Sequence, residues 1–131
     1  MHVINIKPLK AYTDNYIWLL ETNEEVSVVD PGDAKPVLDY LSKTNKNLRD
    51  IFITHHHFDH TAGVPELENI ISGSIYGPKN SYELINEKVT QGDTLSSLGI
   101  KFEIIEVPGH TLDHIAFYNE ENNILFCGDT L

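Results

Sequence analysis

A cluster of histidines directly follows a short apolar run, and it constrains the fold more than any other feature of this chain. Residues 51–53 read Ile-Phe-Ile, a run typical of a buried strand, and residues 54–61 read Thr-His-His-His-Phe-Asp-His-Thr. Alternate side chains of a strand lie on one face, so His55 and His57 would converge while His56 faces away. The segment therefore predicts two imidazole ligands for one metal ion at the end of a strand.

Four more side chains extend this pattern into a two-metal site. Asp59 and His60 follow the histidines after a turn and could bind a second ion near the first. His110 and Asp129 each follow directly on another predicted strand, in the sequences Pro-Gly-His-Thr and Cys-Gly-Asp-Thr. Imidazole and carboxylate ligands without thiolate suit zinc, iron or manganese. We therefore predict a dinuclear hydrolytic centre.

Short apolar runs punctuated by turn residues predict one α/β domain over residues 1–131, with no repeat and no linker. Asp33 is placed to cap the first helix, and polar residues 22–24 form a tight turn. Ligand sites of α/β sheets lie at the carboxyl ends of strands, which is where the histidine segment falls. The predicted strands span 3–7, 15–21, 25–30, 51–54, 74–76, 94–98, 100–107, 115–119 and 124–127, and the predicted helices 34–43, 61–68 and, weakly, 81–85.

Composition limits the classes of partner and the cellular location that suit this chain. No apolar stretch approaches the roughly 20 residues that span a membrane, and the N-terminus does not resemble a signal peptide. The single cysteine, Cys127, excludes an internal disulfide, and its apolar neighbours predict a core position. Nine basic against twenty acidic residues give a net charge of −11, which disfavours nucleic acid. We expect a cytoplasmic protein with neither a nucleic-acid nor a membrane partner.

The chain resembles the N-terminal part of the glyoxalase II family, the hydroxyacylglutathione hydrolases of the metallo-β-lactamase superfamily. The histidine segment 54–63 indicates the superfamily, and three segments indicate the glyoxalase II branch: Asp14–Trp18, Pro108–Leu112 and Leu125–Leu131. Further matching residues are 29–34, 76–78 and His114. The resemblance implies an α/β (α+β) fold, the metallo-β-lactamase αββα sandwich, incomplete at the C-terminus.

The same resemblance implies roles for individual residues. Two divalent metal ions are implied, zinc first and iron or manganese as alternatives. Asp30 would orient the ligand loop, and His114 would make a structural hydrogen bond rather than bind metal. The implied ligands are His55, His57 and His110 for the first ion, Asp59 and His60 for the second, and Asp129 between them.

The implied reaction is hydrolysis of S-D-lactoylglutathione to D-lactate and glutathione, a step of methylglyoxal detoxification. A metal-bridging hydroxide would attack the thioester carbonyl, and Asp59 would hold and orient that hydroxide as the catalytic carboxylate. The thiolate of glutathione would then leave without a covalent acyl-enzyme.

The sequence also departs from the family pattern. Family members carry a further histidine ligand and a helical glutathione-binding domain downstream of the position of Leu131, and they usually have glycine where this chain has Asp113. One alternative is therefore a metal-binding fragment without turnover, whose uncovered apolar surface would favour self-association. Another is a different hydrolase of the superfamily, such as a lactonase, a persulfide dioxygenase or a β-lactamase.

Overall fold

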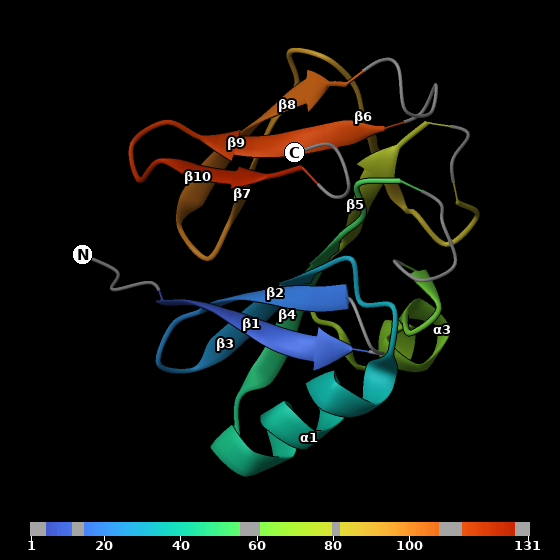
Figure 1. Ribbon diagram of the computed structural model, residues 1–131, viewed down its shortest axis with the longest axis vertical. Coiled ribbons are helices and arrows are strands. Elements are labelled where there is room, and N and C mark those ends of the chain that lie inside the picture. The colour runs from blue at the N-terminus through green and yellow to red at the C-terminus, as the bar shows by residue number, and fades with distance from the viewer. Residues whose placement is uncertain (1–4, 12–14, 56–60, 80–81, 108–113, 128–131) are drawn as a thin grey trace.

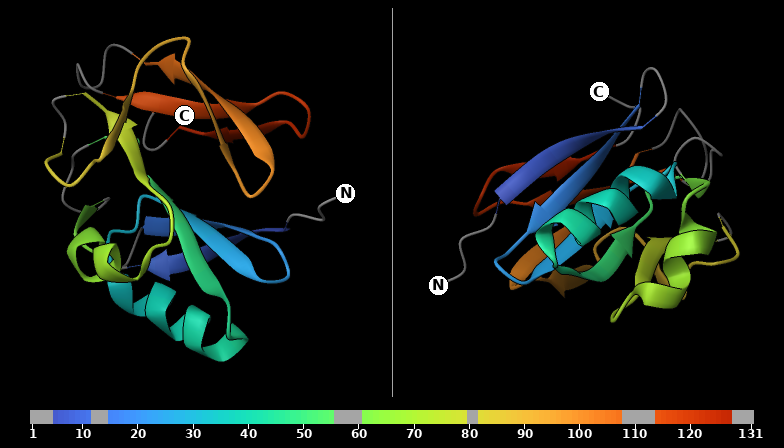
Figure 2. Two further views of the ribbon diagram at one scale, coloured as in Figure 1. Left: turned by 180° about the vertical axis from the view of Figure 1, so that it is seen from behind. Right: turned by 90° about the horizontal axis from the view of Figure 1, so that it is seen from below.

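Two β-sheets face each other, and the helices lie on the outer side of the larger sheet (Figure 1, Figure 2). The computed structural model describes residues 5–11, 15–55, 61–79, 82–107 and 114–127. Within these ranges the layers run helix, sheet, sheet. Of the αββα sandwich that the sequence predicts, the described residues supply three layers, with helices on one side.

The larger sheet has six strands in the order β1-β2-β3-β4-β5-β6. β1, β2 and β3 pair antiparallel, whereas β3, β4, β5 and β6 pair parallel, so the carboxyl ends of these last four strands lie at one edge. The strand bounds are β1 Asn5–Ala11, β2 Asn15–Glu21, β3 Glu25–Val29, β4 Asn47–Phe52, β5 Ile75–Pro78 and β6 Glu87–Val89.

The smaller sheet is an antiparallel meander in the order β10-β9-β8-β7. Left-handed backbone at Leu98 and Gly99 makes the turn between β7 and β8, and Asn123 has a positive φ in the turn before β10. The strand bounds are β7 Thr94–Ser97, β8 Ile100–Glu106, β9 Ile115–Asn119 and β10 Ile124–Phe126.

Helix α1, Ala34–Thr44, begins as the sequence predicts. The Asp33 carboxylate accepts a hydrogen bond from the Lys35 N–H at 3.1 Å, and Asn45 ends the helix in the left-handed conformation. Helix α3, Val64–Leu67, and the 3-10 turn η1, Glu68–Ile70, follow the ligand segment. Both helices pack on the larger sheet.

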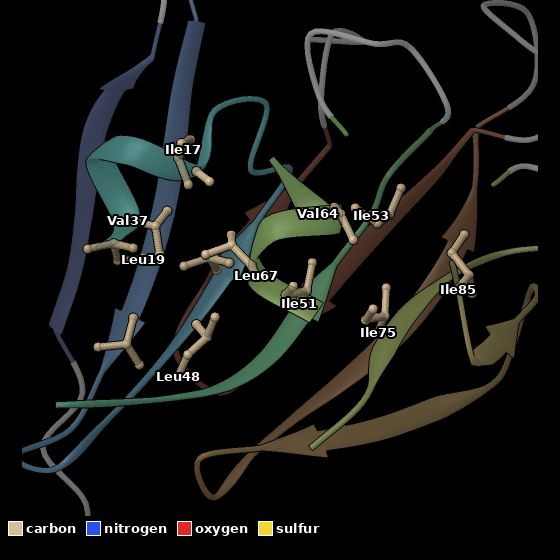
Figure 3. Packing of buried hydrophobic residues seen from close by; sticks show 13 residues of the cluster. Ile17, Leu19, Val37, Leu48, Ile51, Ile53, Val64, Leu67, Ile75 and Ile85 are labelled. Atoms are coloured by element: carbon tan, nitrogen blue, oxygen red, sulfur yellow. The ribbon is translucent and has the colours of Figure 1, made fainter. Parts of the chain in front are cut away.

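Two apolar cores separate the layers. The first lies between the helices and the larger sheet and includes Ile17, Leu19, Ile51 and Ile53 (Figure 3). The second lies between the sheets, where the Phe52 ring stacks on Phe117 with centroids 4.9 Å apart. Because β4 is central, Ile51 and Ile53 face one core while Phe52 faces the other.

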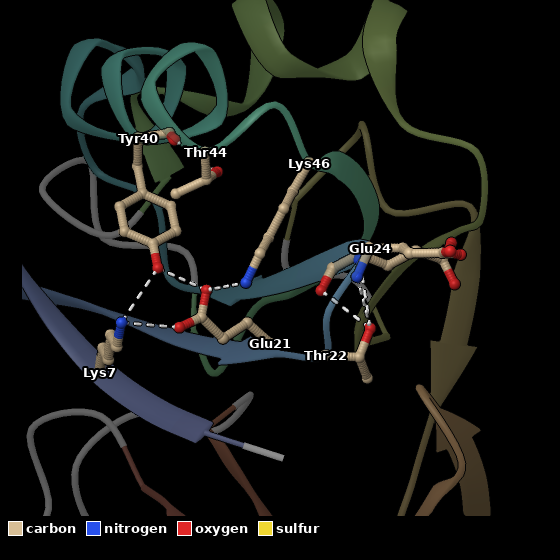
Figure 4. A network of polar contacts seen from close by, with 8 residues as sticks. Lys7, Glu21, Thr22, Glu24, Tyr40, Thr44 and Lys46 are labelled. Atoms are coloured by element: carbon tan, nitrogen blue, oxygen red, sulfur yellow. Dashed lines mark hydrogen bonds and ion pairs between the residues drawn. The ribbon is translucent and has the colours of Figure 1, made fainter. Parts of the chain in front are cut away.

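A buried carboxylate attaches the end of β2 to its neighbours (Figure 4). Glu21 is 1% exposed, and it accepts from Lys7 Nζ and Lys46 Nζ, each at 2.9 Å, and from the Tyr40 hydroxyl. Burial, the largest influence, raises the pKa of Glu21, but the hydrogen bonds from Tyr40, Lys46 and Lys7 outweigh it and hold the pKa at about 2. The hydrogen bonds to this one carboxylate therefore hold β1, β2 and helix α1 together.

A second polar cluster connects the two sheets. Asp50 of β4 is 3% exposed; its carboxylate accepts from the Ser97 hydroxyl of β7 at 2.6 Å and from the Ser74 N–H at 2.8 Å. The Ser27 hydroxyl of β3 lies 2.7 Å from that of Ser97. A buried carboxylate is stable only when such donors surround it, so this cluster fixes how β7 docks on β3 and β4.

Several predicted elements differ from the structure. β4 begins at Asn47 rather than at residue 51, because its first half alternates exposed and buried residues instead of being apolar throughout. Of the helix predicted over 61–68, residues 61 and 64–67 are helical, a turn at 62–63 separates them, and a 3-10 turn follows. The weak helix over 81–85 is wrong: of its described residues, 83 and 84 form a turn, and the short strand β6 follows.

Large apolar side chains remain exposed at the β1–β2 edge of the larger sheet, among them Ile6, Tyr16 and Trp18. Trp18 lies opposite Pro8 in the register. Self-association through exposed apolar surface stays a prediction. No helix within the described ranges is long and apolar enough to cross a membrane.

Candidate metal centre

The predicted ligand segment begins at the carboxyl end of β4. Beyond Phe52 the chain continues through Ile53, Thr54 and His55, which are all fully buried. Because most of the proposed ligands fall outside the described residues, the structure places His55 and the residues that flank the others, and the ligand set stays a prediction. No three potential ligands gather elsewhere in the described ranges. The ligands outside them are His57, Asp59, His60, His110 and Asp129.

Asp30 arrives at the same edge from the neighbouring strand. It directly follows β3, and its backbone N–H donates to the Phe52 carbonyl at 2.8 Å, which continues the parallel ladder by one bond. Its φ of 50° is left-handed, a conformation that aspartate tolerates better than most residues. The turn directs the buried Asp30 carboxylate toward the segment after β4.

A hydrogen-bond relay joins that carboxylate to the first predicted ligand. Asp30 Oδ1 accepts from the Thr54 N–H at 2.8 Å, and Asp30 Oδ2 accepts from the Thr54 hydroxyl at 2.6 Å. Thr54 Oγ1 also lies 2.9 Å from His55 Nδ1. Since the only hydroxyl hydrogen is directed at Asp30, the Thr54 oxygen accepts from Nδ1, which therefore carries the proton.

This relay leaves His55 in the form that can bind a metal ion. A neutral imidazole with its proton on Nδ1 presents the lone pair of Nε2 in the ring plane, and metal-binding histidines are held in this way by a polar partner behind the ring. The relay also agrees with the expectation that Asp30 orients the ligand loop. The chemistry of the donors is thus consistent with a bound divalent cation.

The loop after β3 is held against the segment after the ligands. The Gly63 N–H donates to the Pro31 carbonyl at 2.8 Å. A Cβ at Gly63 would lie 2.5 Å from the Pro31 oxygen and 2.6 Å from the Ala34 nitrogen, so only glycine allows this approach. The contact joins the loop before α1 to the residue before α3, which comes after residues 56–60 in the sequence.

His114 is the second histidine that the structure places here. It is 1% exposed, and its ring stacks on that of His55 with centroids 4.5 Å apart and planes 14° from parallel. Its Nε2 lies 2.9 Å from the Cys127 carbonyl oxygen; because a carbonyl only accepts, Nε2 carries a proton and donates. The structural hydrogen bond expected of His114 is confirmed. Cys127, for which the apolar neighbours predict a core position, is half-buried.

Sequence reasoning missed two of these features. Thr54 counts there only as part of the histidine segment, although a hydroxyl residue beside Asp30 at the shared edge of parallel strands is a usable signal. The stacking of His114 on His55 joins residues 59 positions apart, and no local pattern predicts it.

Comparison with known proteins places these observations in a family. The model of the metallo-beta-lactamase superfamily matches residues 13–131. Hydroxyacylglutathione hydrolases from Pseudoalteromonas translucida, Idiomarina loihiensis and Chromohalobacter salexigens are 48%, 44% and 47% identical over 98% of this chain. The chain covers 51–52% of each, so it spans about half the length of these curated relatives.

Solved structures share the fold at lower identity. The BLEG-1 B3 metallo-beta-lactamase superposes with a TM-score of 0.83 at 20% identity, over 97% of this chain and 73% of that one. ETHE1 from Myxococcus xanthus gives 0.78 at 25% identity, over 98% and 58%. TTHA1623 in a di-iron-bound form gives 0.74 at 25% identity, over 95% and 72%.

Proposed function

We propose that this chain, which belongs to the metallo-β-lactamase superfamily, is the metal-binding part of a hydrolase of glutathione thioesters. The observation that carries the proposal is the buried relay from Asp30 through Thr54 to His55 at the carboxyl end of β4. The identity of 44–48% to three hydroxyacylglutathione hydrolases supports the substrate class. The reaction would convert S-D-lactoylglutathione and water into D-lactate and glutathione.

The proposed centre takes two divalent ions. Support for two ions comes from the histidines at 55 and 57 followed by Asp59 and His60 in the sequence, and from a similar protein, TTHA1623, which was solved in a di-iron-bound form. We propose zinc as the metal and keep iron and manganese as alternatives, since imidazole and carboxylate suit all three. The proposed ligands are His55, His57, His110, Asp59, His60 and Asp129.

The chemistry that such ions supply is Lewis-acid activation of water and of a carbonyl group. The chain's own residues hold and orient. His55 would offer Nε2 while the Thr54 relay keeps its proton on Nδ1, and Asp59 would accept a hydrogen bond from the attacking water. A thiol has a pKa of roughly 8.5, low enough for the glutathione sulfur to depart as the thiolate and take its proton from water afterwards, so no residue needs to donate a proton to it.

The test compares neighbouring histidines. Protein purified without chelator is analysed for metal content and for hydrolysis of S-D-lactoylglutathione, alongside lactone, persulfide and β-lactam substrates. His55→Ala should lose metal and any turnover, whereas His56→Ala, expected to face away, should keep both. Equal effects of the two substitutions would contradict the ligand assignment.

The substrate panel separates the alternatives. Metal binding with no turnover of any substrate would support a metal-binding unit without activity of its own, and preferential turnover of a lactone, persulfide or β-lactam would replace the thioester by that class. A cytoplasmic location also belongs to the proposal; cell fractionation tests it.

A further inference from the structure

His114 contacts described residues that lie close in the sequence to three predicted ligands. Its backbone carbonyl accepts from the Val107 N–H at 3.0 Å, and His110 lies between these two residues in the sequence. Its side chain donates to the carbonyl of Cys127, two residues before Asp129 in the sequence. Its ring covers the ring of His55. One buried residue thus touches the first ligand and ties down the chain beside two others.

The contact also joins the two sheets. His114 directly precedes β9 of the smaller sheet, and the Ile115 N–H donates to the Thr54 carbonyl at 2.9 Å. Thr54 in turn holds the proton on His55 Nδ1. The His55 ring is therefore bounded by a hydrogen bond at Nδ1 and by a flat aromatic face, and both restrict rotation about its χ2.

The geometry argues against His114 as a ligand of the same ion as His55. A metal lies in the plane of each imidazole that binds it, about 2 Å from nitrogen. Two rings whose planes are 14° from parallel and whose centroids are 4.5 Å apart cannot direct lone pairs at one point that near. In addition, Nε2 of His114 donates to Cys127.

We propose that His114 is a positioning residue of the metal centre, which sets the ring orientation of His55 and holds the Cys127 segment, from which Asp129, the ligand predicted between the two ions, follows by two residues. This inference rests on the proposed metal centre. A purely structural role would stabilise the fold without changing how a bound ion is coordinated.

Three substitutions separate the contacts of His114. Phenylalanine keeps a flat ring but has no N–H donor, glutamine keeps a donor but has no ring, and alanine has neither. The matched control is Asn119→Ala, because Asn119 is also buried, lies on β9, and donates its side-chain N–H to the Lys101 carbonyl at 2.7 Å, far along the strand from His114.

The measurement is Co²⁺ titration of the apo protein, followed by visible absorption and by competition with a chelator, with circular dichroism to establish the folded fraction. We expect His114→Ala to raise the Kd for Co²⁺ about 10- to 100-fold and to change the absorption spectrum of the bound ion. His114→Phe and His114→Gln should show smaller increases, and Asn119→Ala should keep the wild-type Kd and spectrum.

The outcomes distinguish the two proposals. Wild-type protein that binds no Co²⁺ would overturn the metal centre and this inference with it. Wild-type binding that His114→Ala leaves unchanged, or reduces no more than Asn119→Ala does, would overturn the inference alone. Should the alanine variant not fold, the phenylalanine and glutamine variants decide: wild-type Kd and spectrum in both would refute it.

Discussion

Replacing Thr54 by valine should weaken both the fold and the metal centre by a calculable amount. Valine has nearly the shape of threonine but no hydroxyl, so it keeps the packing of this fully buried position. It removes the 2.6 Å bond to Asp30 and the 2.9 Å bond from His55 Nδ1. The bond from the Thr54 backbone N–H to Asp30 remains.

The two lost bonds set the size of the effect. A buried hydrogen bond contributes about 0.5–1.5 kcal/mol, and one to a charged group about 1.5–3 kcal/mol, so Thr54→Val should lower the free energy of unfolding by about 2–4.5 kcal/mol. Loss of the group behind a ligand imidazole weakens metal binding about 10- to 100-fold. Thr54→Ser keeps the hydroxyl and loses a methyl group, at about 1 kcal/mol.

Urea unfolding in the presence of a chelator measures stability without the contribution of bound metal, and Co²⁺ titration of folded protein measures affinity. The serine variant should bind Co²⁺ almost as tightly as the wild type, and the valine variant should not. Equal Kd values for the valine variant and the wild type would refute the relay, and so would equal losses in the two variants.

Three further substitutions test the anchors of the fold. Because the pKa of Glu21 lies at about 2, well below its ordinary value of 4.5, its stabilisation of about 3 kcal/mol is present above pH 4.5 and is lost as the pH falls toward 2; Glu21→Gln should remove that part of the acid sensitivity in urea unfolding. Ser97→Ala should cost about 2–3 kcal/mol on chemical unfolding, whereas the exposed neighbour Ser96→Ala should change stability by less than about 0.5 kcal/mol; similar losses would contradict the inter-sheet role. Gly63→Ala should lower the melting temperature more than Gly92→Ala, since a Cβ at Gly92 meets nothing within 4 Å and only its φ of +87° is unfavourable.

Sequence patterns predicted the strands whose alternation or apolar content is complete. β2 has the predicted bounds, and α1 has the predicted start with Asp33 as its cap. The sequence did not predict the first half of β4, because Asp50 breaks its apolar pattern. Asp50 is buried at an inward position that an apolar residue normally fills. The sequence did not predict β6 either, because three residues with one buried valine are too few to show a periodicity.

In the candidate metal centre, too, some residues could be predicted from the sequence and others could not. Histidine and aspartate spacing predicts ligand types from the sequence, because metal chemistry restricts the residues that can serve. The residues that orient a ligand are less restricted: a threonine and a stacked histidine contact the predicted ligand His55 here, and many side chains could. Their roles depend on which strand ends meet, which is a property of the folded chain.

The two sheets meet beside His55, the first predicted ligand, and this would make inter-sheet packing part of the proposed metal centre. Phe52 precedes Thr54 by two residues and stacks on Phe117, which follows Ile115 by two residues on β9. The same two segments exchange the bond from the Ile115 N–H to the Thr54 carbonyl and the ring contact between His55 and His114. Aromatic packing, a backbone hydrogen bond and ring stacking therefore follow one another along a single line from the core to the site. A shift of one sheet against the other would change all three together, so the orientation of the His55 ring, the first predicted ligand, is set by the same contacts that hold the two sheets together.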